Sequence, residues 1–236
     1  MADHLTEEEQ VEALKRWWKE NWLSIVLPCV VALVGWMGWS SWEDHKLGRA
    51  QAASDQFEAL SKAAEVQPGA AMSAEQKVIV SGLAEALVSD FNGSLYADMG
   101  NLMLAKLHVE DKQLDVAASR LQEVVTGGAN ASIVQLASAR LARVLAAKGD
   151  VDQALALVAQ SNSETYTALF AEIRGDIYHS QGKMGQAHTA YVEALSSLPP
   201  SEFGRTSLIQ LKRDAVAQSA PVAETEPTEA AAEGDA

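Results

Sequence analysis

The side chains that could do chemistry in this chain of 236 residues are few and widely spaced. Five histidines and one cysteine, Cys29, are the candidate metal ligands and nucleophiles. His179 and His188 are close enough in sequence to share a metal ion, but such a site needs further ligands and none accompanies them. Cys29 lies in an apolar run, where a thiol is inert. We therefore predict no metal site and no thiol-based catalysis.

Motifs for other kinds of catalysis are also missing. The sequence contains no glycine-rich phosphate loop, no nucleophile elbow and no His-Glu-x-x-His motif, and Gly127-Gly128 is typical of a loop. The formal net charge of −14, from 32 acidic and 18 basic residues, argues against nucleic acid, because phosphate binding needs a basic surface. A single cysteine excludes a disulfide framework. These observations predict a protein that is not an enzyme, has no cofactor and acts by binding.

An uncharged run at residues 21–42 contains or adjoins all six tryptophans of the chain. As a helix it would be about 33 Å long, enough to cross a hydrocarbon core of about 30 Å. Indole rings prefer the boundary between lipid and water, so two tryptophan clusters around an apolar run indicate a helix that spans a lipid bilayer. A buried core helix is the alternative. The expected interface residues are Trp17, Trp18 and Trp22 at one end and Trp36, Trp39 and Trp42 at the other.

The span is expected to be an uncleaved signal anchor. The residues before it are too acidic for a signal peptide, and Val26-Leu27-Pro28-Cys29 lacks the small residue that precedes a lipidated cysteine. Basic residues are equally numerous on the two sides, so their count does not decide the orientation. Those before the span lie closer to it, and Glu43-Asp44 follow it directly. We predict a cytoplasmic N-terminus, with the rest of the chain on the other side of the membrane.

From residue 43 onward the chain has the composition of helices, being rich in Ala, Leu, Gln and Glu and poor in the runs that mark strands. Helix breakers such as Gln67-Pro68-Gly69 and Pro199-Pro200 separate segments with apolar residues three and four apart. Ser73 to Gln76 has the pattern of a capping box. We predict helices over residues 44–66, 74–90 and 202–218, with antiparallel helical pairs between the last two.

A pattern of small and large residues recurs in these pairs. It begins at Ala105, Ala142 and Gly175, so that the offsets between repeats are 37 and 33 residues. A larger residue follows after 3 positions, an alanine after 12 and an apolar residue after 16. Small residues let the backbones of two helices approach closely. The residues at these positions are, in turn, His108, Leu145 and Tyr178; Ala117, Ala154 and Ala187; and Leu121, Val158 and Tyr191.

Repeats of this length resemble the tetratricopeptide class, whose unit has about 34 residues. The third repeat matches its signature positions well, whereas the first has Lys112 where glycine is usual, and none has the signature tryptophan. The resemblance implies an all-α fold, in which a single N-terminal transmembrane helix is followed by a tetratricopeptide-like solenoid of helical hairpins. A generic helical bundle is the alternative.

In tetratricopeptide stacks the first helix of each pair lines a groove, and the resemblance implies a protein-binding groove here. Its positions are more apolar than a solvated face requires, and they lack the ladder of Lys and Arg that clamps a carboxylate terminus. We expect weak binding of apolar protein segments, unless neighbouring helices cover these positions. The expected groove residues are Met99, Leu102, Lys106, Val109, Leu136, Ala139, Arg143, Ala146, Leu169, Glu172, Asp176 and His179.

The chain is thus expected to have four parts. A cytoplasmic amphipathic segment covers residues 1–21, and the transmembrane helix covers residues 22–42. The tetratricopeptide-like domain covers residues 43–218. The remaining residues, 219–236, carry five acids, no base and no large apolar residue, which predicts a disordered acidic tail.

The segment EEEQVEALKRWWKENW, followed by one spanning helix and a degenerate tetratricopeptide domain, resembles the YfgM family of ancillary subunits of the bacterial SecYEG translocon. Residues 136–150 and the third repeat support the likeness, which ends near Gln218. It implies an inner-membrane anchor with a periplasmic repeat domain. It also implies that the partners are the SecYEG translocon, the periplasmic chaperone PpiD and exported protein clients. Two other functions stay open: a regulator whose N-terminal helix binds a cytoplasmic factor, and a scaffold for envelope assembly.

Overall fold

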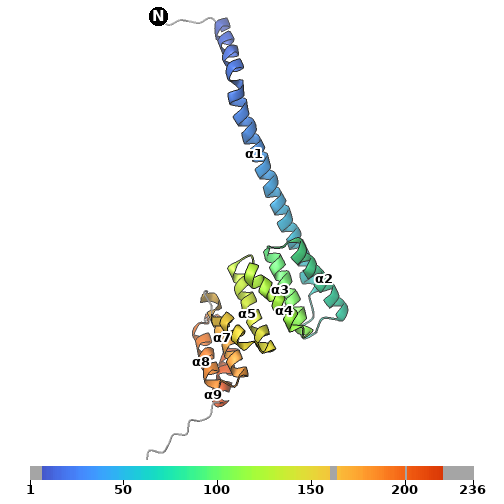
Figure 1. The fold of residues 1–236 in the computed structure, drawn as a ribbon, viewed down its shortest axis with the longest axis vertical. Helices are drawn as coiled ribbons and strands as arrows, with labels where there is room; N and C mark the ends of the chain where they lie inside the picture. Colours follow the sequence, from blue (N-terminus) through green and yellow to red (C-terminus); the bar gives the residue numbers. More distant parts are fainter. Residues whose placement is uncertain (1–6, 160–163, 200, 220–236) are drawn as a thin grey trace, which may run out of the picture. The chain divides into compact units, whose positions relative to one another are not determined.

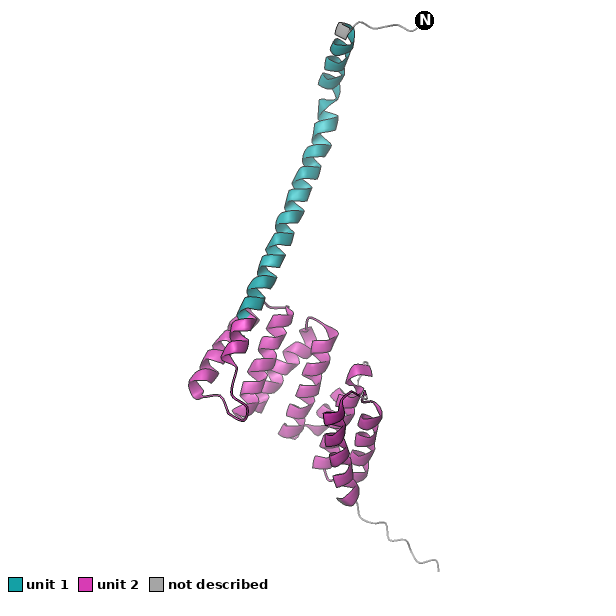
Figure 2. Ribbon diagram, turned by 180° about the vertical axis from the view of Figure 1, so that it is seen from behind, with its two compact units in different colours: residues 1–56 teal, residues 57–236 magenta. Residues whose placement is uncertain are grey.

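The computed structural model describes residues 7–159, 164–199 and 201–219, and the regular elements in these ranges are all helices (Figure 1). The chain forms two compact units, Met1–Gln56 and Phe57–Ala236 (Figure 2). The first unit is helical throughout its described part. The second is built of helices packed against their neighbours in sequence. The expected all-α fold is therefore confirmed.

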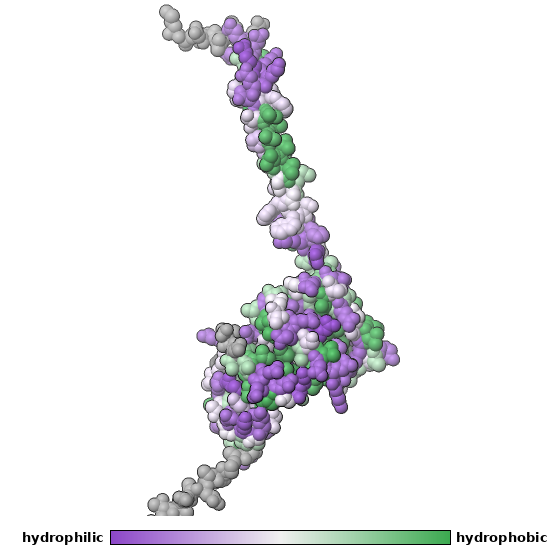
Figure 3. Space-filling model, in the orientation of Figure 1, coloured by the Kyte–Doolittle hydropathy of each residue, from purple (hydrophilic) through white to green (hydrophobic). Residues whose placement is uncertain are grey.

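Helix α1, Glu7–Ala63, runs without a break through the predicted transmembrane segment and on into the second unit. Pro28 lies inside it, where membrane helices tolerate proline. The predicted helix at residues 44–66 is thus the continuation of the span, and no helix end marks the expected boundaries near residues 21 and 43. A band of hydrophobic side chains crosses the middle of the α1 rod (Figure 3).

Among the described residues, the second unit consists of the end of α1 and eight further helices. From α2 to α9, helices that are adjacent in sequence pack together, and α3, α5 and α7 also contact one another in series. The bounds of these helices are α2 Ala74–Asp90, α3 Leu95–Glu110, α4 Leu114–Gly127, α5 Ala131–Lys148, α6 Val151–Ala159, α7 Glu164–Ser180, α8 Met184–Ser196 and α9 Phe203–Ser219.

Helix starts follow the local sequence closely. Ser73 caps α2 as predicted, since its hydroxyl accepts a hydrogen bond from the Gln76 backbone N–H at 3.1 Å. The side chain of Gln76 does not close the capping box. It donates instead to the backbone carbonyls of Ala63 and Glu65, at 2.7 and 2.9 Å, where α1 ends and leaves carbonyls without helical partners.

The predicted repeat appears as three turns of the same construction. In each turn one residue adopts a left-handed conformation: Lys112 (φ 60°), Gly149 (φ 94°) and Gly182 (φ 73°). The next backbone N–H then donates to the carbonyl five residues earlier, on His108, Leu145 and Tyr178 respectively, at 2.7 to 2.9 Å. This is the bonding of a Schellman motif, in which glycine is the favoured residue.

The small residues of the pattern lie where paired helices touch. Ala105, Ala142 and Gly175 are buried, as are the three alanines that follow them. Gly175 gives the clearest case, because a Cβ there would lie 2.5 Å from the ring of Tyr191 on α8. The pair α7–α8 can therefore pack this closely only without a side chain at position 175.

The left-handed Lys112 yields a stability prediction. A residue with a Cβ is strained in this conformation by roughly 1–2 kcal/mol. Glycine avoids this strain, but it costs about 0.5–1 kcal/mol of stability because its unfolded chain has more conformational freedom to lose. We expect Lys112→Gly to raise the free energy of unfolding by about 0.5–1 kcal/mol. The measurement is urea denaturation of the full chain in nanodiscs, monitored by circular dichroism at 222 nm. Tryptophan fluorescence would not report on the repeats, because every tryptophan lies in α1, outside them.

Gly182→Lys, at the equivalent turn, is the matched reverse change and should lower the stability by a similar amount. If both variants destabilise, the turn conformation does not control the stability of the repeat.

Candidate functional site

Two pockets lie along the first helices of the repeats, and Arg143 on α5 lines both; we call the two pockets together the groove. The first pocket, of about 360 Å³, lies between α3 and α5. The second, of about 210 Å³, lies between α5 and α7. The lining of the first is Leu102, Ala105, Lys106, Val109, Glu110, Leu121, Arg140 and Arg143, and that of the second is Arg143, Ala146, Ala147, Ile173, Asp176, Ile177 and Ser180.

The first pocket has an apolar floor and a charged rim. Leu102 and Leu121 are buried at its base, and Val109 is 40% exposed at its side. Its rim carries three basic residues and one acid, Glu110. Such a surface suits a peptide that offers apolar side chains together with negative charge.

The electrostatics of this rim depend on two neighbouring arginines of α5. Arg140 and Arg143 are three residues apart on one helix face, and so their guanidinium groups repel one another. Burial, and then the charge of Arg143, lower the pKa of Arg140 below its ordinary value. Arg140 is still charged at neutral pH, and the repulsion would be relieved by an anion bound between the two groups.

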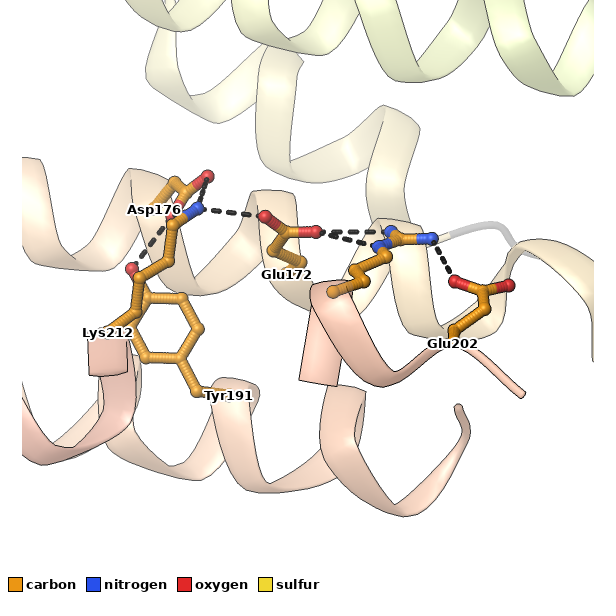
Figure 4. A network of polar contacts seen from close by, with 6 residues as sticks. Glu172, Asp176, Tyr191, Glu202 and Lys212 are labelled. Carbon is orange, nitrogen blue, oxygen red and sulfur yellow. Dashed lines mark hydrogen bonds and ion pairs between the residues drawn. The ribbon is translucent and has the colours of Figure 1, made fainter. Parts of the chain in front are cut away.

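At the far end of the repeats, two of the predicted groove residues are engaged by the last helix (Figure 4). Glu172 is only 5% exposed and accepts hydrogen bonds from Lys212 at 2.8 Å and from Arg205 at 3.1 Å, both on α9. Asp176 accepts hydrogen bonds from Lys212 at 2.8 Å and from the Tyr191 hydroxyl, also at 2.8 Å. Both carboxylates therefore fasten α9 to α7.

The pKa directions agree with this arrangement. Burial by itself raises the pKa of Glu172, but the hydrogen bonds and charges of Lys212 and then Arg205 outweigh it, so the pKa lies below its ordinary value. The pKa of Tyr191 is raised, first by burial and then by its hydrogen bond to Asp176. Glu172 is thus ionised and Tyr191 protonated at neutral pH, which is the state that the hydrogen bonds require.

The predicted groove residues fall into four groups, of which the six that line the pockets are the largest. Four members are partly or fully buried beside the groove, Glu172 is held by α9, and His179 is exposed outside the two pockets. Arg140 lines the groove but was not predicted, although its place one turn before Arg143 is a usable signal. The predicted residues that line the pockets are Leu102, Lys106, Val109, Arg143, Ala146 and Asp176. Those that lie beside the pockets are Met99, Leu136, Ala139 and Leu169.

The membrane-facing candidates lie on α1, which is the one helix among the described residues long and apolar enough to cross a membrane. Its two tryptophan clusters are centred about 20 residues, or about 30 Å, apart, which is the thickness of a hydrocarbon core. The rings of Trp39 and Trp42 meet edge to face at 5.6 Å, and the Lys46 ammonium lies 3.5 Å from the Trp42 ring centre. The exposed tryptophans are Trp17, Trp18, Trp22, Trp36, Trp39 and Trp42.

The rest of the second unit offers weaker candidates for a binding site. A pocket of about 430 Å³ between α2 and α3 includes Lys77, but that ammonium is already paired with Asp111 at 2.5 Å and Glu110 at 3.4 Å. No group of three metal-ligating side chains occurs in the part of the chain that the structure describes.

Comparisons with known proteins extend over both units. Residues 15–218 match the family described as tetratricopeptide repeat-like domain. The chain is 30% identical to the "Ancillary SecYEG translocon subunit" of Neisseria gonorrhoeae, over 92% of this chain and 100% of that protein. The proteins of the same name from Haemophilus influenzae and Escherichia coli are each 27% identical, over 84% of this chain and 92% and 91% of their own lengths. No solved structure matches the chain significantly.

The ion pairs between α7 and α9 yield a second prediction. Lys212→Met should lower the free energy of unfolding by about 1–2 kcal/mol, because Glu172 is left buried with one cation instead of two. The comparison variant is Lys62→Met, whose pair with Glu58 is exposed on both sides and should leave the stability unchanged. Denaturation in nanodiscs, read at 222 nm, gives both values. Equal effects of the two changes would show that burial adds nothing to the α7–α9 contact.

Proposed function

The chain belongs to the tetratricopeptide repeat-like family that includes the ancillary SecYEG translocon subunits, and on this premise we propose that it is a non-enzymatic subunit associated with SecYEG. The observation that carries the proposal is the extent of the likeness: the Neisseria gonorrhoeae relative aligns over its whole length, with 30% identity. The family match likewise includes the apolar helix as well as the repeats. An unrelated repeat protein would share only the second unit.

The proposed orientation has residues 1–21 in the cytoplasm, α1 in the inner membrane and the repeats in the periplasm. The bases before the span and the acids directly after it support this direction. In that orientation the groove faces the compartment into which translocated chains emerge.

The proposed task of the groove is to hold segments of exported proteins and pass them to a periplasmic chaperone of the PpiD kind. Unfolded chains present apolar side chains, and the floor around Leu102 and Val109 can bury one such side chain. The pockets are small and open, so each segment is held weakly and released readily. Weak binding suits a surface that takes many different sequences.

The orientation predicts which residues an impermeant reagent can reach. In a Cys29→Ser background, Thr189→Cys, at an exposed position of α8, should react with an impermeant maleimide in intact cells whose outer membrane is permeabilised. Glu12→Cys, before the span, should react only after the inner membrane is opened. The reverse pattern would place the repeats in the cytoplasm and would contradict the proposed function.

The partners are tested by photocrosslinking in membranes. A photoreactive residue at Val31, exposed on the span, should crosslink to SecYEG. The same residue at Val109 in the groove should crosslink to exported chains or a periplasmic chaperone, and at Val192 on α8, 43% exposed and outside the groove, it should crosslink to neither. Crosslinks only to cytoplasmic regulators or cell-wall enzymes would overturn the assignment and favour the two other functions.

A further inference from the structure

The rim of the first pocket carries more positive charge than its own residues neutralise. Glu110 is the one acid in its lining, and it is shared between Lys106 at 3.9 Å and Lys77 at 3.4 Å. Arg140 and Arg143 have no ion pair with any residue that the structure describes. Two unpaired guanidinium groups beside an apolar floor form a site for a carboxylate-bearing peptide.

The chain carries a segment of matching chemistry at its own C-terminus. The tail was predicted at residues 219–236, but Ser219 ends α9 and the rest lies outside the described residues. We call residues 220–236, APVAETEPTEAAAEGDA, the acidic tail. The small apolar residues 220–223 are followed by three glutamates, separated by threonine and proline up to Glu229, and the tail contains no base. Two prolines, Pro221 and Pro227, favour an extended backbone, which reduces the entropy lost when a peptide is laid along a groove. The family match ends at residue 218, so the tail is additional to the family domain.

The tail starts on the correct side of the repeats to reach the groove. Arg205 of α9 contacts Glu172 of α7. Lys212, further along α9, contacts Glu172 and also Asp176, which lies further along α7. Helix α9 therefore runs in the same direction as α7. The second pocket joins the C-terminal halves of α5 and α7, which therefore also run in the same direction. Helix α9 thus ends, at Ser219, on the side where the C-terminal halves of α5 and α7 form the groove.

The length of the tail is sufficient for this contact. Three steps between neighbouring helices, from α9 to α7, α5 and α3, amount to about 30 Å at 8–10 Å each. Seventeen extended residues reach about 56 Å at 3.3 Å per residue. Tethering gives the tail an effective concentration on the order of millimolar at the groove, so even a weak contact is occupied for much of the time.

We propose that the acidic tail docks in the groove of its own chain, with its carboxylates on Arg140 and Arg143, and must be displaced before another polypeptide binds. The tail then acts as an internal competitor that raises the apparent dissociation constant for client binding. This inference uses the groove of the proposed function, but it needs neither the translocon nor a client.

The test is photocrosslinking within the purified full chain in nanodiscs, with no partner present. A photoreactive residue at Val109 should crosslink to peptides of the acidic tail, as identified by mass spectrometry. The yield should fall about fivefold in Arg140→Gln/Arg143→Gln, and equally when the five tail acids are replaced by Gln and Asn, because exposed ion pairs are individually weak. Adding 0.5 M NaCl should act in the same direction.

Three controls make the outcome decisive. The photoreactive residue at Val192, with nearly the same exposure as Val109, should give no tail crosslink. Arg213→Gln, which removes a cation of α9 already paired with Asp214, should leave the Val109 yield unchanged. A mixture of heavy and light chains should give crosslinks only within one chain. Equal yields at Val109 and Val192, no effect of the arginine changes, or crosslinks only between chains would each overturn the proposal, whatever SecYEG does.

Discussion

The close contact between paired helices is the constraint on which the second unit depends. Ala105, Ala142 and Gly175 leave so little side chain that the partner helix packs against the backbone, and at Gly175 the Tyr191 ring fills the space where a Cβ would lie. The two helices of each pair therefore lie close together, and successive pairs stack with α3, α5 and α7 side by side. The groove is a consequence of this stacking, because its two pockets lie between the first helices of neighbouring pairs and share Arg143.

The same stacking must end somewhere, and α9 provides the end. Ile209 and Val216 bury its apolar side, while Lys212 and Arg205 bind the acids of α7 (Figure 4). A further repeat would continue the groove past α7, but here the carboxylates of Glu172 and Asp176 are neutralised from within the chain. The open part of the groove is therefore the cationic part, around α5. The proposed binding surface is thus apolar and cationic, which is complementary to acidic and apolar segments rather than to basic ones.

The sequence predicted what depends on neighbours in the chain. The bounds of α2 and the cap at Ser73 follow from residues a few positions apart. The sequence also showed Lys112 at a position where the repeat usually has glycine, and the structure adds its left-handed conformation. It did not predict that Glu172 meets Lys212, because that contact joins residues 40 positions apart and either side chain alone has the pattern of an exposed face. Leu102 was assigned to the groove from the tetratricopeptide resemblance, and the structure places it at the pocket floor, only 6% exposed. A resemblance gives the face of a helix but not the depth of a residue on that face.

The proposed function requires that the face of α3 and α5 around Arg143 be a binding surface that the repeats leave open. Hydrogen exchange of the chain in nanodiscs, with and without an unfolded exported polypeptide, tests this claim most directly, and the five acids of the tail are replaced by Gln and Asn so that the tail does not occupy the groove. Slower exchange is expected in the C-terminal halves of α3 and α5, with α2 and α8 unchanged, because binding raises the local opening free energy of the helices that are touched. Protection confined to α2 or α8, or no protection in any helix, would contradict it.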